Sequence, residues 1–342
     1  MSPVTPAPVA QPYTFRPMRR ADVPDLFRLR QVLAAEEPDS NALTLADVLE
    51  RDFGDPWADP ATDWRLGLAA DGTVVARACL SANPEPEAEV VATLSFDIHP
   101  AHRTDALQAP LLDWLTARAA ERVRAIAADN PGRQPLVLRL FCWDGRRDLC
   151  ARLQRHGFQP VRYHDRLRRD LRAPIPDRPL PAGLVLRPYH PELDEPIRLA
   201  RNETFRDGWD FKPLSPAEWQ VSVIRRSSFR PDLSFAILAG DEVVAFSLNR
   251  FEPDKAGGSD FDAGWIGMLG TRRAWRQRGL ASALVVHSLR AFQAAGLGCA
   301  GLGVDAENPT GALRLYEHLG FALLMSHIVL DKLVEASASP KH

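Results

Sequence analysis

The sequence has few of the residues that build metal centres and disulfide frameworks. It contains four cysteines and nine histidines in 342 residues, and neither type shows the close spacing of metal ligands. We therefore expect reduced, partly buried thiols and no metal site. The cysteines are Cys79, Cys142, Cys150 and Cys299.

Long apolar runs and a strong net charge are also missing. No apolar stretch reaches membrane-spanning length, and the Pro/Ala-rich residues 1–12 lack the basic start and apolar centre of a signal peptide. The formal net charge is −2, which provides no global cationic field for a nucleic acid. We expect a cytoplasmic protein with no membrane partner and no nucleic-acid partner.

What the sequence does contain is enough apolar residues, 45% of 342, to build the cores of two ordinary domains. Four prolines between residues 172 and 183 indicate a semi-rigid linker. The predicted organisation is a disordered tail at 1–12, a first domain at 13–171, the linker at 172–183, a second domain at 184–335 and a tail at 336–342.

The order of elements before the linker repeats after it. Arg16-Pro returns as Arg187-Pro, and Gly157-Phe returns as Gly320-Phe, at offsets of 187 − 16 = 171 and 320 − 157 = 163. Each copy reads strand, two helices, three strands, helix, strand, helix, strand, with the second helix of the first copy at 43–53. This order predicts a duplicated α/β domain whose sheet is antiparallel at hairpins and parallel where a helix crosses over.

One strand-to-helix connection, residues 264–281, organises the second copy. Residues 265–271 are typical of a strand, and helical periodicity begins at Leu280, directly after Gly279. The unpaired N–H groups at such a helix start, together with the positive end of the helix dipole, form an anion site. Arginines at 272, 273, 276 and 278 add charge, so we expect a phosphate or pyrophosphate ligand.

A second motif lies downstream at 302–321. A strand ends at Asp305, Asn308-Pro opens a helix that carries Tyr316, and the helix closes at Gly320. Together with Arg-Gln-Arg-Gly-Leu-Ala at 276–281, this run resembles the GNAT superfamily of acyl-CoA-dependent N-acyltransferases. The repeat resembles the tandem arrangement of mycothiol synthase-like members. The resemblance implies an α/β fold of two tandem GNAT-like domains, each a mixed, mostly antiparallel sheet flanked by helices.

The resemblance also implies how acetyl-CoA is held. Main-chain groups of Leu269 and Thr271 would bind the pantetheine arm, and Asn308 would contact the co-substrate. Tyr316 would donate a proton to the leaving thiolate. Backbone N–H groups would bind the pyrophosphate at Arg276, Gln277, Arg278, Gly279, Leu280 and Ala281. The plainer alternatives are a solvated basic turn, an Asn308 that only caps its helix and a Tyr316 that only packs in the core.

The general base and the acceptor site are less defined. No carboxylate lies on 265–271. Glu252, Asp260 or Asp262 could act through a water, but all three are better explained as solvated turn acids, so we leave the base unassigned. The resemblance places the acceptor site in the segment 202–211, where Asn202, Glu203 and Trp209 would line the amine pocket. A cationic substrate would be held by Glu203, Asp207 or Asp210. The alternative is an ordinary loop anchored by its aromatic residues.

The first copy has lost these features. Its equivalent loop, 103–108, has Ala106 in place of the glycine and Gln108 in place of the small residue. Leu153 takes the place of Tyr316, and Gly145 that of Asn308. We predict a degenerate first domain with a structural or substrate-covering role.

These observations favour transfer of an acyl group, acetyl above all, from acyl-CoA to a primary amine of a small molecule, with both substrates bound together. A non-catalytic acyl-CoA-binding sensor or scaffold is the alternative. Nucleic-acid binding through 272–278 is not expected, because the charge is confined to one loop. The acceptor, the acyl group and the oligomeric state stay open.

Overall fold

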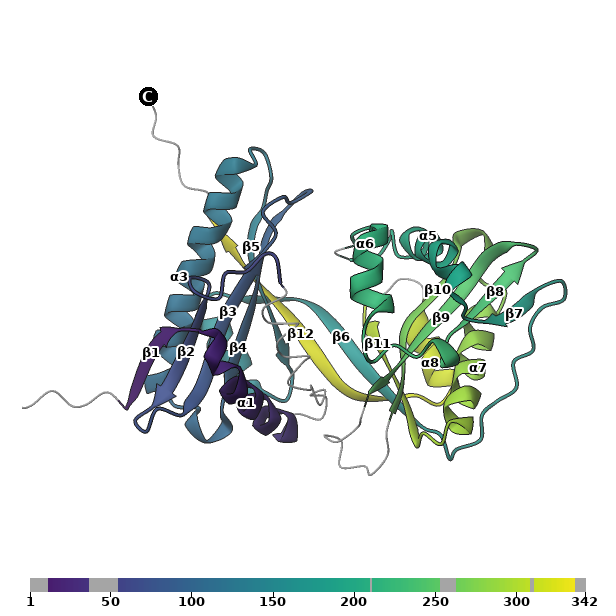
Figure 1. Ribbon diagram of the computed structural model, residues 1–342, viewed down its shortest axis with the longest axis horizontal. Helices are drawn as coiled ribbons and strands as arrows, with labels where there is room; N and C mark the ends of the chain where they lie inside the picture. Colours follow the sequence, from purple (N-terminus) through teal and green to yellow (C-terminus); the bar gives the residue numbers. More distant parts are fainter. Residues whose placement is uncertain (1–11, 37–54, 210, 253–262, 308–310, 336–342) are drawn as a thin grey trace, which may run out of the picture. The chain divides into compact units, whose positions relative to one another are not determined.

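The computed structural model describes residues 12–36, 55–209, 211–252, 263–307 and 311–335 (Figure 1). The predicted helix at 43–53 and nearly all of the two predicted tails lie outside these residues. Contacts divide the chain into two compact units: unit 1 is Met1–Val161 with Ile328–His342, and unit 2 is Arg162–His327. The division falls inside two long strands, β6 (Gln159–Asp170) and β12 (Ala322–Val334), so each of them contributes to both units.

Unit 1 is a twisted sheet in the order β1-β2-β3-β4-β5, followed by the C-terminal part of β12. Strands β1 to β4 pair antiparallel, and β4 pairs parallel with β5. Helices α3 (Asp105–Asp129) and α4 (Arg147–Arg155) cover one face, and α1 (Val23–Glu36) packs on the other. The strands span Tyr13–Pro17 (β1), Trp64–Ala69 (β2), Val74–Ala82 (β3), Val90–Ile98 (β4) and Leu136–Trp143 (β5).

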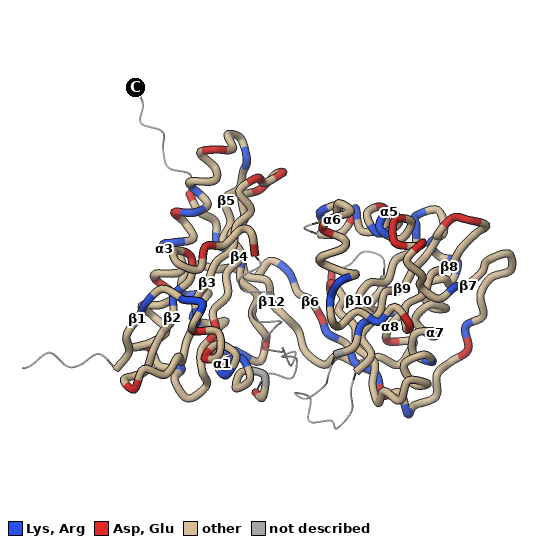
Figure 2. The backbone as a smooth tube through the Cα atoms, viewed as in Figure 1, with Lys and Arg blue, Asp and Glu red and all other residues tan. Residues whose placement is uncertain are grey.

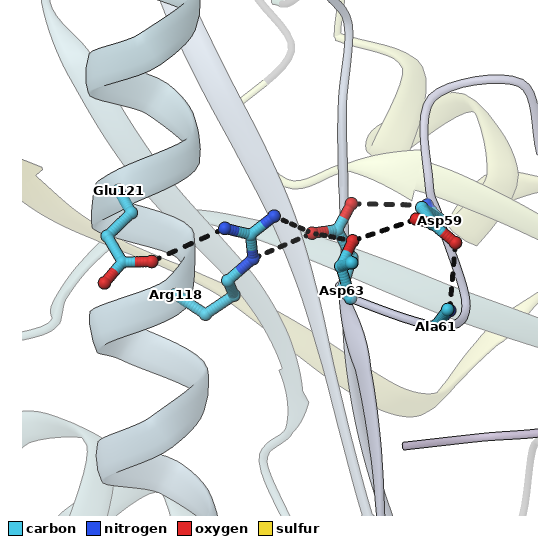
Figure 3. A network of polar contacts seen from close by, with 6 residues as sticks. Asp59, Ala61, Asp63, Arg118 and Glu121 are labelled. Carbon is cyan, nitrogen blue, oxygen red and sulfur yellow. Dashed lines mark hydrogen bonds and ion pairs between the residues drawn. The ribbon is translucent and has the colours of Figure 1, made fainter.

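An ion pair between a part-exposed arginine and a buried carboxylate fastens α3 to the segment before β2 (Figure 3). Arg118 of α3 donates to Asp63 from Nε at 3.0 Å and from Nη2 at 2.8 Å, and Asp63 is only 2% exposed. Asp63 also accepts from the backbone N–H of Asp59 at 3.2 Å, which closes the turn that leads into β2. A carboxylate this buried needs such donors, because removing it from water is otherwise costly.

Unit 2 contains the order β6-β11-β10-β9-β8-β7, with the N-terminal part of β12 beside β6. Strand β10 pairs parallel with β11, while the pairs β11–β6, β10–β9, β9–β8 and β8–β7 are antiparallel. The mixed, mostly antiparallel sheet that the sequence predicts is thereby confirmed. The strands span Val185–Pro188 (β7), Phe235–Ala239 (β8), Glu242–Glu252 (β9), Ala263–Thr271 (β10) and Cys299–Asp305 (β11).

Helices cover both faces of the unit 2 sheet (Figure 1). The side chains of Phe246 and Leu248 on β9 pack against α5 and α6, whereas Ala245 packs against α7. This division follows from the alternation of side chains along a strand. The helices span Asp194–Thr204 (α5), Pro216–Trp219 (α6), Leu280–Ala294 (α7) and Ala312–His318 (α8), and α6 continues as a π-helical turn, Gln220–Ile224.

Each unit takes one strand from the other half of the sequence. Strand β11 takes β6 as its outer neighbour, in antiparallel register from Cys299↔Asp170 to Asp305↔His164. In unit 1 the same place is taken by residues 328–334 of β12. The predicted domains, 13–171 and 184–335, are each continuous in sequence. The units defined by contacts differ from them because each unit includes a strand segment from the other half of the chain.

A buried polar network connects β9 to α7. The Nδ2 atom of Asn249 donates to Ser288 Oγ at 2.9 Å and to the Leu233 carbonyl at 2.5 Å. Ser247 Oγ donates to Asn249 Oδ1 at 2.9 Å and lies 3.2 Å from Ser288 Oγ. Asn249, Ser247 and Ser288 are all 0% exposed, so every lost partner leaves a polar atom away from water.

We predict that Asn249→Ala lowers the free energy of unfolding by about 3 kcal/mol, because it leaves the Leu233 carbonyl and two serine hydroxyls short of partners. Urea denaturation of the full chain measures the change. Ser282→Ala on α7 is the control and should change stability by less than about 0.5 kcal/mol. Equal stabilities of the two variants would show that the network carries no such energy.

Candidate active site

Strands β10 and β11 run together and then separate. They are paired from Ala263↔Cys299 to Ile266↔Leu302. At Gly267 the register of β10 shifts, and the strand continues to Thr271 paired with β9 alone. Strand β11 meanwhile follows β6 as far as Asp305. The sheet therefore opens between residues 268–271 of β10 and the end of β11.

The opened edge exposes main-chain hydrogen-bonding groups. The N–H of Arg272 donates to the Val244 carbonyl of β9 at 2.9 Å. Because hydrogen-bonding direction alternates along an antiparallel strand, Gly270 also faces β9, while Leu269 and Thr271 direct their N–H and C=O groups to the opened side. These are the two residues for which the resemblance implies contact with the pantetheine arm. The hydroxyl of Thr271 is buried, with no hydrogen-bond partner among the described residues.

The connection from β10 to α7 presents a run of unpaired N–H groups. The backbone φ is +61° at Gln277 and +79° at Gly279, and Gln277 is the one non-glycine residue with positive φ in the described part of the chain. No described residue accepts from the N–H groups of 277–282, and the first helical bond is from Ala283 to the Gly279 carbonyl at 3.0 Å. When residues with left-handed φ alternate with residues of negative φ, successive N–H groups point to one side of the chain. Such a run of N–H groups forms an anion-binding concavity.

Gly279 is needed for its conformation. A Cβ added at this position would meet nothing within 4 Å, so crowding by the protein does not exclude a side chain. The left-handed φ is the constraint, and it is unfavourable for residues other than glycine. Gln277 adopts a similar positive φ although its side chain makes this conformation unfavourable. Strain of this kind concentrates at ligand-binding loops.

The arginines of this loop mostly bind the protein itself. Arg272 donates from Nε to the Val243 carbonyl at 2.7 Å and forms an ion pair with Glu203. Arg273 donates to Asp207 Oδ1 at 2.6 Å. Their charge is therefore largely compensated within the fold, and the loop is fastened to the end of α5.

The remaining two arginines differ from each other. Arg276 donates from Nη2 to the Thr204 carbonyl at 3.0 Å and from Nε to the Thr271 carbonyl at 3.3 Å. Its N–H donates to the Arg273 carbonyl at 3.3 Å, so the run of unpaired N–H groups begins one residue later. Arg278 is exposed, and its guanidinium carbon lies 4.8 Å from the centre of the Trp275 ring. An anion placed at this loop would therefore meet backbone N–H groups more than guanidinium charge.

Tyr316 lies on α8 and is 7% exposed. Its ring contacts Phe321 edge-on with centroids 6.0 Å apart, and no described residue forms a hydrogen bond with its hydroxyl. Burial raises the pKa of this phenol to about 12, so it is protonated throughout the neutral range. Core packing and proton donation are compatible at this position. Asn308 lies outside the described residues.

The predicted acceptor residues have separate surroundings. The Asn202 amide accepts from the Leu214 N–H and donates to the Leu214 carbonyl, both at 3.0 Å. Glu203 accepts from the N–H of Arg273 at 3.4 Å in addition to pairing with Arg272. Asn202 and Glu203 therefore order the segment after α5 and the basic loop, respectively.

Trp209 leads to a histidine that the sequence analysis missed. Its ring lies 6.0 Å from the ring of His164 on β6. His164 is opposite Asp305 in the strand register, at the end of β11 where the sheet opens, and burial lowers the pKa of its imidazole. No local signal marks this residue, because it lies before the Pro-rich segment and joins unit 2 only through the exchange of β6.

The carboxylates considered as bases cannot be placed beside these groups. Asp260 and Asp262 lie outside the described residues, and Glu252 ends β9 with its side chain also outside the description. No group of three or more His, Cys, Asp or Glu in the described part of the chain could hold a metal ion. No described helix is long and apolar enough to cross a membrane.

The corresponding connection in unit 1 is closed. The N–H groups of Leu107 and Gln108 donate to the Thr104 carbonyl at 3.2 and 3.0 Å, which uses donors that are unpaired in unit 2. Asp105 places a carboxylate on the first turn of α3, where it would repel a phosphate. Leu153 is fully buried. These contacts agree with the predicted loss of function in the first copy, which stays a prediction.

Charge along the chain is mixed in sign. Figure 2 shows Lys and Arg interspersed with Asp and Glu along the described backbone of both units.

Comparison with known proteins identifies the family. The Acetyltransferase (GNAT) family matches residues 195–321. A mycothiol acetyltransferase of Salinispora tropica is 30% identical over 325 residues, covering 85% of this chain and 97% of the relative. The mycothiol acetyltransferase of Thermobispora bispora is 29% identical over 84% of this chain and 88% of its own length.

Solved structures agree in fold. A GCN5-related N-acetyltransferase from Sphaerobacter thermophilus matches with a TM-score of 0.71 at 24% identity, covering 97% of this chain and 98% of the other. A tandem GNAT protein from the clavulanic acid biosynthesis pathway matches with a TM-score of 0.63 at 15% identity, covering 96% and 99%. The relative from Salinispora tropica is similar along nearly its whole length, and the family model matches most of unit 2. The fold is that of the tandem GNAT protein. This chain therefore belongs to the acetyltransferase (GNAT) family.

Proposed function

We propose that this chain transfers an acetyl group from acetyl-CoA to a primary amine of a small molecule, with both substrates bound together. The observation that carries the proposal is the run of unpaired N–H groups at 277–282 next to the opened edge of β10. The relatives named mycothiol acetyltransferase support a small-molecule acceptor, and a mycothiol-related amine is the first to test. The cytoplasmic location expected from the sequence is part of this proposal.

The residues fit the co-substrate at both of its polar ends. The N–H groups of 277–281 would hold the pyrophosphate, and Arg278 would add charge from the exposed side of the loop. Main-chain groups of Leu269 and Thr271 would hold the amides of the pantetheine arm, and Asn308 would add a contact. Bound acetyl-CoA supplies an activated thioester. The Leu269 N–H on the opened side would donate to its carbonyl oxygen as negative charge builds there.

Tyr316 would act as a hydrogen-bond donor to the departing sulfur. A thiol has an ordinary pKa of about 8.5, whereas burial raises the pKa of Tyr316 to about 12. The phenol therefore carries its proton throughout the neutral range, and a hydrogen bond donated from it would stabilise the departing thiolate.

His164 would accept the proton of the attacking amine. Its imidazole is half-buried at the opened end of β11, beside Trp209, which the sequence assigned to the acceptor. Because burial lowers its pKa, the ring is neutral near pH 7 and can take a proton directly or through water. This role gives the exchanged strand β6 a part in the chemistry of unit 2.

The proposal is tested by the release of free thiol from acetyl-CoA in the presence of a panel of small-molecule amines, with mass spectrometry of each amine. Acetylated amine and equimolar thiol are expected. The second candidate, a non-catalytic sensor, is favoured by the absence of a carboxylate on β10. Stabilisation by coenzyme A without turnover on any amine would contradict the enzyme and support the sensor.

We predict that Gly279→Ala weakens binding of coenzyme A at least about tenfold, because alanine disfavours the left-handed φ that turns the N–H groups together. Isothermal titration calorimetry measures the dissociation constant. Gly240→Ala is the matched control: Gly240 also has positive φ, +57°, and open space around its Cβ position, but lies in the β8–β9 turn. Equal affinities in the two variants would place the pyrophosphate elsewhere.

We predict that Tyr316→Phe lowers kcat by roughly ten- to a hundredfold while the KM for acetyl-CoA changes by less than about twofold. Phenylalanine keeps the ring that packs on Phe321 and removes only the hydroxyl. Tyr163→Phe, at an exposed tyrosine of β6, serves as the control and should leave kcat unchanged. Unaltered turnover of Tyr316→Phe would remove the hydroxyl from the mechanism.

We predict that His164→Gln lowers kcat/KM at least about tenfold and removes the acid limb of its pH profile. A base must be deprotonated, and the pKa of His164 is lowered, so the activity of the natural chain should fall only below about pH 6.5. His287→Gln provides the comparison, since His287 is half-buried on α7 and its pKa is also lowered by burial. A persistent acid limb in His164→Gln would assign the proton to another group.

A further inference from the structure

Two cysteine side chains meet in unit 1. Cys142 is near the end of β5, and Cys150 is on the first turns of α4. Their sulfur atoms lie 2.9 Å apart. The sequence gives no sign of this contact, because the spacing of eight residues matches no metal or redox motif and the approach depends on the turn between strand and helix.

The turn between the two cysteines is fixed. The N–H of Arg146 donates to the Trp143 carbonyl at 2.9 Å, and the N–H of Cys150 donates to the Arg146 carbonyl at 2.9 Å. A Cβ at Gly145 would come within 2.4 Å of the Trp143 ring, so this ring packs directly on the glycine. Backbone hydrogen bonds and the packing of Trp143 therefore fix the turn that brings the two sulfur atoms together.

The two thiols differ in their access to solvent. Cys142 is 2% exposed, whereas Cys150 is partly exposed. Cys142 directs its sulfur toward the Trp143 carbonyl at 3.4 Å and toward Cys150. A dissolved oxidant can therefore reach the sulfur of Cys150, whereas the sulfur of Cys142 is buried next to it.

We propose that Cys142 and Cys150 are a modification site that closes to an intramolecular disulfide when the protein meets hydrogen peroxide or another peroxide of low molecular weight. The sulfurs need to approach by less than about 1 Å to reach disulfide bonding distance. The site lies in unit 1 and uses no residue assigned to the acetyl transfer.

The chemistry balances in two steps. The Cys150 thiolate attacks one peroxide oxygen, the O–O bond breaks, and a sulfenic acid and water form once a proton is taken up. The Cys142 thiol then attacks the sulfenic sulfur, forming the S–S bond and releasing a second water. The peroxide is the two-electron oxidant, and each sulfur loses one electron.

The electrostatics support this order. A hydrogen bond from Cys142 lowers the pKa of the Cys150 thiol, and the Arg146 guanidinium acts in the same direction. The same pairing, together with burial, raises the pKa of Cys142. Thiolate is the reactive form of cysteine, so Cys150 is the sulfur that reacts with peroxide and Cys142 the one that resolves it.

The test uses the full chain, treated with hydrogen peroxide, alkylated in denaturant and digested with trypsin without reduction. Trypsin cleaves after Arg146 and Arg147, which separates the cysteines into peptides 140–146 and 148–152. We expect these peptides to be joined with the loss of two hydrogens, and dithiothreitol to separate them. Amides of 143–149 should exchange hydrogen more slowly in the oxidised protein.

Variants distinguish the proposal from general oxidation. Cys79→Ser, at a buried cysteine under α1, should form the cross-link as the natural chain does. Cys150→Ser should leave Cys142 fully alkylated after peroxide, and Cys142→Ser should drive Cys150 to sulfinic acid. Binding of coenzyme A to each variant reports that unit 2 is folded.

Two results would overturn the proposal. One is sulfinic acid on Cys150 of the natural chain while Cys142 remains alkylated. The other is a disulfide that joins two chains in place of the two peptides of one chain.

Discussion

The separation of β10 from β11 is the constraint on which the rest of unit 2 depends. A parallel pair normally continues for the length of its shorter strand, but here each partner keeps a different neighbour beyond Ile266: β9 holds β10, and β6 holds β11. Gly267 allows the change of register, with the Leu248 carbonyl only 3.2 Å from the position of its absent Cβ. Main-chain groups that a complete sheet would consume therefore remain available, with the start of α7 just beyond them.

In the loop after β10, the arginines stabilise the loop and the backbone conformation orients the N–H groups. Four arginines in seven residues suggest a site made of guanidinium groups, yet three of the four bind carbonyls and carboxylates of their own fold. Glu203 and Asp207 hold the loop from the end of α5. The arginines thus maintain a backbone shape that includes the strained Gln277, and it is this shape that turns the N–H groups together.

Much of this arrangement can be predicted from local sequence. The strand at 265–271 and the helix start at Leu280 follow from periodicity, and the structure confirms both. The left-handed φ of Gly279 is a finding of the structure. The choice of partner for β6 does not follow, because a strand pattern shows which face is buried and leaves the neighbour unspecified. The sequence analysis missed His164 because its place in the site depends on the long-range pairing of β6 with β11. It missed the Cys142–Cys150 contact because that contact depends on the conformation of the turn between β5 and α4. The roles assigned to Leu269, Thr271 and the N–H run remain predictions.

The exchange of β6 and β12 also determines what a fragment of this protein would be. A piece cut in the Pro-rich segment and beginning at residue 184 would contain the whole family match from 195 onward, but would lack the strand that covers the outer edge of β11. The complementary piece would lack the β12 residues that take the same place in unit 1. Each half of the gene thus encodes one strand of the other half's fold. Recombination that separates the two halves would expose a sheet edge in each.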